Sequence, residues 1–214
     1  MNMALRINPY TPGAGMVPRY LAGREALLEE VKDTLAYVAN GYATRSLIYY
    51  GLRSVGKTVL LTEIESIAQE NNIYYEHIEA MENASFMSSI SLKVGQKINT
   101  GAILFIDEVQ YLKNAEFEAI MAAIHRCNQL GLPLVLIAAG LPKIAKIAGD
   151  IKSYAERLFK FIPVDKLQED DAKQALIQPA KKLLINLFLD KVVVTDKQID
   201  IKLTTDAISN MLTK

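Results

Sequence analysis

Residue types that mark particular classes of protein are scarce in this chain of 214 residues. A single cysteine, Cys127, excludes an internal disulfide, and two histidines provide no spacing typical of a structural metal site. No apolar run approaches the ~18 residues of a membrane span, and the first residues lack the layout of a signal peptide. We therefore expect no membrane partner and a cytoplasmic location. Basic and acidic residues balance at 24 each, so net charge argues neither for nor against nucleic acid.

Half of the residues are hydrophobic and 22% are charged, an ordinary composition for a globular protein with a sizeable core. The length suits one domain plus an appendage. Residues 1–22 are rich in proline and glycine and predict an extended N-terminal arm. Cys127 falls within a helical pattern, where a small buried residue is expected.

From residue 46 onward, strand patterns alternate with helix patterns. The predicted strands are 46–50, 73–78, 102–106, 133–139 and 159–163. The predicted helices are 23–40, 57–70, 84–97, 114–130 and 142–149. Four of the five strands are apolar runs, as expected for strands buried on both faces. This alternation predicts an α/β fold with an open parallel sheet covered by helices, in which ligands bind beyond the carboxyl ends of the strands.

The segment from Gly51 to Thr58 fits the pattern Gly-x-x-x-x-Gly-Lys-[Ser/Thr], and it lies between a β-prone run and a helical one. Its glycines allow main-chain N–H groups to turn toward an anion, and the helix start adds partial positive charge. Lys57 can reach the β- and γ-phosphates, while the Thr58 hydroxyl can hold Mg²⁺. The expected contact residues are Gly51, Leu52, Arg53, Ser54, Val55, Gly56, Lys57, Thr58 and Val59. The strand–loop–helix context favours nucleoside triphosphate binding over a glycine-rich turn that binds nothing.

A second motif, residues 102–108, is an apolar run that ends in two carboxylates. Asp107 is predicted to hold Mg²⁺ through its water shell, and Glu108 to polarise an attacking water as general base. The alternative is that both acids merely begin a solvated loop. Paired acids favour hydrolysis over phosphorylation of a small metabolite. No Asn-Lys-x-Asp run is present, so adenine, as ATP or ADP, is preferred to guanine.

Together these motifs resemble the P-loop ATPases of the AAA+ superfamily, in the branch near the STAND and origin-recognition/Cdc6-type ATPases. Prokaryotic ATP-binding proteins with an AAA-16-like domain are the most similar. The residues that carry the resemblance are Pro12 to Gly15, Pro18 to Glu25, Gly51 to Thr58, Ile103 to Gln110, Ala139 to Pro142 and Ser153 to Phe159.

The resemblance implies a three-layer αβα P-loop fold with sheet order 5-1-4-3-2. It implies a base domain at 23–166 and a partial helical lid at 167–214 that would continue beyond Lys214. The sequence of this last segment predicts a helix from Asp170 to about Leu189, a β-prone stretch at 192–194, a polar stretch, and a short helix near 205–213. The resemblance also places Leu21, Gly23 and Arg24 against the adenine.

Arg157 matches an arginine of related ATPases that reaches the γ-phosphate in a neighbouring subunit. The alternative is an exposed helical arginine paired with a nearby acid. Two departures from the family matter. Ser54 stands where relatives usually have glycine, and strand 133–139 ends in Ala138-Ala139-Gly140 with no polar sensor of the γ-phosphate. Hydrolysis is therefore expected to be slow or to use another group.

We expect an ATPase domain that acts as a nucleotide-dependent switch, with self-association through Arg157. One alternative is a regulatory or interaction module that binds nucleotide without turnover. Another is a small-molecule kinase. The sequence does not identify a protein or DNA partner.

Overall fold

The computed structural model describes residues 8–10, 13, 15–81, 100–151, 155–194 and 199–203. The chain divides into two compact units. The larger unit consists of Gly15–Val17 and Arg24–Lys166, and the smaller one of Met1–Ala14, Pro18–Gly23 and Leu167–Lys214.

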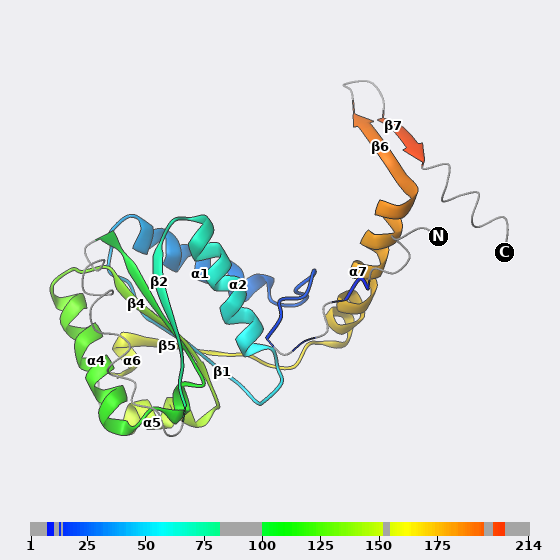
Figure 1. The fold of residues 1–214 in the computed structure, drawn as a ribbon. Helices are drawn as coiled ribbons and strands as arrows, with labels where there is room; N and C mark the ends of the chain where they lie inside the picture. Colours follow the sequence, from blue (N-terminus) through cyan, green and yellow to red (C-terminus); the bar gives the residue numbers. More distant parts are fainter. Residues whose placement is uncertain are drawn as a thin grey trace. The chain divides into compact units, whose positions relative to one another are not determined.

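A five-stranded parallel sheet forms the centre of the larger unit (Figure 1). Its order, β2-β3-β4-β1-β5, is the predicted order read from the opposite edge, so the predicted fold class is confirmed. The strands are β1 Ser46–Tyr50, β2 Tyr74–Glu79, β3 Ala102–Asp107, β4 Leu134–Gly140 and β5 Phe159–Pro163. Each predicted strand end lies within one residue of the observed end.

The helices of this unit follow the predicted pattern closely. They are α1 Glu25–Ala39, α2 Lys57–Glu70, α4 Asn114–Gln129, α5 Lys143–Ile151 and the short α6 Ala155–Leu158, with a 3-10 turn η3 at Val109–Tyr111. The predicted helix at 84–97 lies outside the described residues, and α6 was not predicted. Among the described helices, none is long and apolar enough to cross a membrane.

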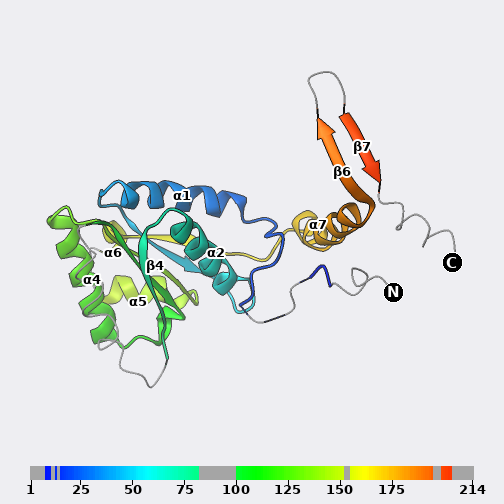
Figure 2. The ribbon, with the colours of Figure 1, turned by 45° about the horizontal axis from the view of Figure 1, so that its top comes forward.

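Helices cover both faces of the sheet, which gives three layers (Figures 1 and 2). Side chains alternate along each strand: Leu47 and Tyr49 pack with α1 and α2, whereas Ile48 packs with α4, α5 and α6. These residues are at most 2% exposed, and each buried large apolar side chain contributes roughly 1.5–3 kcal/mol. Cys127 is buried, as expected. The two apolar layers bury both faces of the strands and so position the loops at their ends.

The carboxyl ends of the parallel strands bring the two sequence motifs to one edge of the sheet. The loop that begins at Gly51 follows β1, and Asp107 is the last residue of β3. Strand β4 lies between β1 and β3, and the main-chain N–H of Gly51 donates to the carbonyl of Gly140 at its end (3.2 Å). The end of β4 is therefore joined directly to the start of the loop.

The smaller unit contains α7, Glu169–Phe188, followed by the antiparallel strands β6, Leu189–Val194, and β7, Ile199–Leu203. The helix and the β-prone stretch agree with prediction. The expectation of a polar stretch after residue 194 was wrong at 199–203, where Ile, Ile and Leu alternate with Asp and Lys at the period of a strand. The predicted helix near 205–213 lies outside the described residues.

Candidate functional site

The loop from Gly51 to Thr58 joins β1 to the first turn of α2, and close packing fixes its start. A Cβ on Gly51 would lie 2.2 Å from the main-chain oxygen of Val164, so a side chain has no room. Gly56, just before α2, has a φ of +90°, in the region that favours glycine. No side chain of the described residues caps the start of α2. Its first N–H groups can therefore bind an anion.

Ser54 also adopts a left-handed conformation, with a φ of +62°. This conformation is uncommon for residues with a side chain and costs roughly 1–2 kcal/mol. From the sequence, Ser54 is notable only because it stands where the resembled family usually has glycine. The structure gives that observation a physical meaning, because the loop keeps the backbone shape of a glycine at this position.

Lys57, the first residue of α2, is 7% exposed. Its Nζ donates to the main-chain oxygens of Gly51 (3.1 Å) and Leu52 (2.8 Å). A buried ammonium group needs such partners, and here the loop itself supplies them. These two hydrogen bonds hold the ammonium group of Lys57 against the first two residues of the loop.

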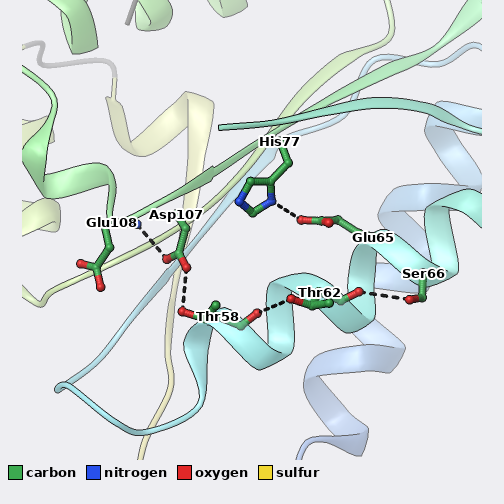
Figure 3. Close-up of polar contacts among 7 residues, drawn as sticks. All are labelled: Thr58, Thr62, Glu65, Ser66, His77, Asp107 and Glu108. Carbon is green, nitrogen blue, oxygen red and sulfur yellow. Dashed lines mark hydrogen bonds and ion pairs between the residues drawn. The ribbon is translucent and has the colours of Figure 1, made fainter. Parts of the chain in front are cut away.

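Asp107 and Thr58 meet across the loop. The Thr58 hydroxyl donates to Oδ2 of Asp107 (2.6 Å), and Oδ1 accepts from the main-chain N–H of Glu108 (2.8 Å) (Figure 3). Asp107 is 5% exposed. Its burial argues against the alternative that this carboxylate merely begins a solvated loop.

A threonine hydroxyl and a carboxylate are hard oxygen ligands, the type that Mg²⁺ prefers. The described residues contain no group of three or more His, Cys, Asp or Glu side chains that could hold a metal ion. Mg²⁺ keeps several waters and is held by one or two protein ligands together with substrate phosphates. Thr58 and Asp107 thus fit the predicted metal.

Glu108 follows β3 and adopts a left-handed backbone with a φ of +52°. Its carboxylate oxygen Oε2 accepts a hydrogen bond from the side-chain amide of Gln110. Non-glycine residues in this conformation are uncommon and concentrate at functional sites. The turn brings the Glu108 carboxylate to the same edge of the sheet as Asp107, as the sequence motif requires.

The structure also brings to the site two residues to which the sequence motifs assign no role. Gln110 is 7% exposed although its side chain is polar, and the hydroxyl of Tyr111 accepts from Nη2 of Arg53 in the loop (3.1 Å). The available signal was position alone, because both residues lie within three positions of Glu108. Of the other predicted loop residues, Leu52 is 61% exposed and Val59 lies partly buried in the first turn of α2.

Arg24 reaches the loop from the start of α1. Its Nη2 donates to the main-chain oxygens of Val55 (2.9 Å) and Asp165 (2.7 Å), and the residue is 8% exposed. Leu21 and Gly23 belong to the smaller unit, where a Cβ on Gly23 would lie 2.6 Å from the Asp171 carboxylate. The expected contact of Leu21, Gly23 and Arg24 with adenine stays a prediction.

Arg157 lies on the exposed side of α6, immediately before β5. Phe159 pairs with Ser46, so Arg157 is at the amino-terminal edge of the sheet. The loop from Gly51 to Thr58 lies at the opposite end of the strands. The five residues of β1 separate the two ends by roughly 16 Å. The structure therefore does not bring Arg157 to the site of its own chain.

His77 on β2 lies beside this site, and its Nδ1 contacts the Glu65 carboxylate of α2 (Figure 3). The hydrogen bond with Glu65 raises the pKa of His77 above its ordinary value, and the negative charges of Asp107 and Glu79 act in the same direction. Burial opposes the rise. The imidazole thus joins the outer strand to α2 and, when protonated, adds positive charge near Asp107.

Residues 43–140 match a protein family described as an AAA domain. This span runs from just before β1 to the end of β4, so it includes the phosphate loop and the acidic strand. A comparison with curated proteins found no match.

Several solved structures share the fold. The Cdc6p protein of Pyrobaculum aerophilum is 15% identical, with a TM-score of 0.62 over 79% of this chain and 52% of that one. The ADP form of the Aeropyrum pernix ORC2 protein is 12% identical, with a TM-score of 0.58 over 79% and 55%. The Aeropyrum pernix ORC1 protein in complex with DNA is 18% identical, with a TM-score of 0.50 over 77% and 51%. This chain spans about half the length of each, and the likeness concerns the fold.

Proposed function

Because residues 43–140 match a family described as an AAA domain, we propose that this chain binds ATP together with Mg²⁺ and hydrolyses it. The observation that carries the proposal is the Thr58–Asp107 hydrogen bond. It joins the end of the phosphate loop to the acidic strand, which are the two parts that a triphosphate–magnesium site requires.

The chain supplies the phosphate contacts from the loop and from α2. The uncapped N–H groups at the start of α2 would bind phosphate oxygens, and the helix end adds partial positive charge. Lys57 now donates to two neutral carbonyl oxygens. A charged phosphate oxygen is a stronger acceptor, so the ammonium group would turn toward bound ATP.

Mg²⁺ held by Thr58 and Asp107 would neutralise charge on the phosphate oxygens. Glu108 would orient a water molecule and accept its proton as that water attacks the γ-phosphate in line. Lys57 would stabilise the negative charge of the transition state.

The role of Glu108 can be tested with Glu108→Gln. We expect turnover to fall by about 100-fold or more, because general-base catalysis contributes on this scale. ATP affinity, measured by titration with a fluorescent analogue, should change less than about twofold, since the loop contacts remain. Glu70→Gln, at the exposed end of α2, is the matched control and should keep wild-type turnover. Equal turnover in Glu108→Gln and wild type would contradict the assignment.

A nucleotide-binding module without turnover is the second candidate. The end of β4, Ala138-Ala139-Gly140, favours it because no polar side chain there can contact a γ-phosphate. Phosphate release measured beside a binding titration distinguishes the two candidates. Binding without release would support the module and contradict hydrolysis.

We further propose that nucleotide binding acts as a switch through Arg24, in the manner of STAND and Cdc6-type ATPases. Arg24 bonds the loop at Val55 and the segment after β5 at Asp165. The chain passes between the two compact units directly after Gly23 and Lys166, next to these contacts. A shift of Val55 on nucleotide binding would thus be transmitted to these two of the four connections between the units.

Limited proteolysis of residues 164–168 tests this switch. In wild type, saturating ATP and ADP should give different cleavage rates, and Arg24→Met should remove the difference because the guanidinium link is lost. Arg126→Met, on the exposed side of α4, is the control and should behave as wild type. A difference that persists in Arg24→Met would reject the role of Arg24.

A further inference from the structure

A buried glutamine connects the acidic motif to the end of β4. Gln110 lies in η3, two residues after Glu108, and is 7% exposed. Its Oε1 accepts from the main-chain N–H of Leu141 (2.9 Å), and its Nε2 donates to Oε2 of Glu108. Both ends of one side-chain amide are therefore used.

The orientation of this amide is set by its partners. The N–H of Leu141 is a donor, so it requires the carbonyl end of Gln110. A carboxylate is an acceptor, so it requires the NH₂ end. The reverse orientation would place donor against donor and oxygen against carboxylate. Gln110 can satisfy both neighbours in one orientation only, and that orientation directs an N–H at Glu108.

Packing at the end of β4 depends on the same side chain. A Cβ on Gly140 would lie 2.7 Å from Oε1 of Gln110 and 2.8 Å from Cγ1 of Val109. Glycine at position 140 therefore leaves the space through which Gln110 reaches Leu141. The carbonyl of the same Gly140 accepts from Gly51 at the start of the phosphate loop. One short piece of β4 thus contacts both the loop and the glutamine that holds Glu108.

We propose that Gln110 is the positioning residue for Glu108. Its amide holds Oε2 of the carboxylate and leaves Oε1 to accept the proton of the attacking water. Through Leu141, the orientation of Glu108 is tied to the end of β4 and so to the phosphate loop. This inference rests on the proposed hydrolysis. It also means that the apolar end of β4 is accompanied by a polar side chain, Gln110, which η3 supplies.

Two substitutions separate positioning from a structural role. Gln110→Met removes both hydrogen bonds, whereas Gln110→Glu keeps an acceptor for Leu141 and loses the N–H that holds Glu108. Both should lower kcat by about tenfold with ATP affinity within about twofold, because the interaction acts on the reacting step. If Gln110 only stabilises η3 and β4, the uncharged Gln110→Met will lower the free energy of unfolding and retain wild-type kcat. Gln129→Met, on the exposed side of α4, is the matched control.

A double substitution tests whether Gln110 acts through Glu108. In a Glu108→Gln background, Gln110→Met should lower turnover by less than about twofold, since residues that act as a unit are not additive. A further tenfold loss would show an independent role and overturn the proposal.

A measurement without turnover keeps the test separate from the proposed function. In a ¹⁵N–¹H spectrum of the whole chain, the side-chain NH₂ signals of Gln110, assigned with Gln110→Met, should shift when Glu108 is replaced by Ala. Signals that do not move would overturn the proposal. Should the wild type bind ATP and release no phosphate, hydrolysis fails, and these signals still decide whether Gln110 holds Glu108.

Discussion

The hydroxyl of Thr58 donates a 2.6 Å hydrogen bond to Oδ2 of Asp107, a residue 49 positions away in the sequence. Thr58 belongs to the motif that follows β1, and Asp107 ends β3; these two strands are not neighbours because β4 lies between them. The first turn of α2 therefore reaches past the end of β4 to the acidic strand. This contact makes one site of two separate sequence motifs.

Replacing Thr58 tests that contact. Thr58→Val keeps the shape of the side chain and removes the hydroxyl, so the affinity for ATP in the presence of Mg²⁺ should fall by about tenfold or more. Affinity measured in EDTA should be unchanged, because the loop amides and Lys57 remain. Thr58→Ser retains the hydroxyl and should match wild type in both conditions. An equal loss with and without Mg²⁺ would count against a metal-binding role for Thr58.

Gly51→Ala tests the packing that fixes the start of the loop. The added Cβ would lie 2.2 Å from the main-chain oxygen of Val164, so one of the two segments must move. We expect the free energy of unfolding, from urea titration, to fall by about 1–3 kcal/mol. Gly149→Ala, in α5 with no atom within 4 Å of its added Cβ, should stabilise by up to about 1 kcal/mol. Equal stability of wild type and Gly51→Ala would contradict this packing.

Mixing two inactive variants tests the predicted action of Arg157 on a neighbouring copy. Arg157 lies at the edge of the sheet opposite to the loop, so it can serve only another molecule. Arg157→Ala should lower turnover at least about tenfold, because an arginine at the transferred phosphate contributes strongly. Adding Lys57→Ala, which lacks a working loop and retains Arg157, should restore part of that turnover. No gain at any ratio would indicate that Arg157 has no role between copies.

The contact of His77 with Glu65 predicts a pH dependence of stability. The pKa of His77 is raised in the folded chain, so this residue binds its proton more tightly there than when unfolded. Its contribution is therefore complete below the ordinary histidine pKa of about 6.5 and is lost as the pH rises through the raised value. Replacing His77 with Gln should reduce the free energy of unfolding more at about pH 5.5 than at about pH 8.5.

Glu65→Gln is the partner variant for this measurement, because the Glu65 carboxylate is the group that His77 contacts. It should destabilise more at the lower pH, as His77→Gln does. Destabilisation that is the same at both pH values would show that the contact acts through packing rather than through charge.

The sheet of the larger unit could be predicted from sequence because its strands carry strong local signals. Strand β4 is an uninterrupted apolar run bounded by a proline and a glycine–leucine–proline turn, and β3 ends at two carboxylates. Such strands must be buried on both faces, which requires a parallel sheet between helices. The weaker alternation at 199–203 includes Asp200 and Lys202 and was mistaken for a polar stretch.

Long-range contacts at the site could not be predicted in the same way. Nothing local to Gln110 indicates that its amide ends at Leu141, because that contact depends on β3 and β4 lying side by side. The sequence around Arg24 predicts only the start of a helix. Its hydrogen bonds to Val55 and Asp165 join three segments that are distant in the sequence. The motif predicted which residues form a phosphate-binding loop, whereas the structure was needed to show what holds that loop in place.

Isothermal titration calorimetry with ATP and Mg²⁺ tests the central claim, that the loop from Gly51 to Thr58 binds a triphosphate. Wild type should bind one ATP per chain. Lys57→Ala should lose about 1.5–3 kcal/mol of binding free energy, the contribution of a hydrogen bond to a charged group. Lys113→Ala, exposed before α4, should bind as wild type. No heat from wild type at millimolar ATP, or equal affinity in wild type and Lys57→Ala, would contradict the account.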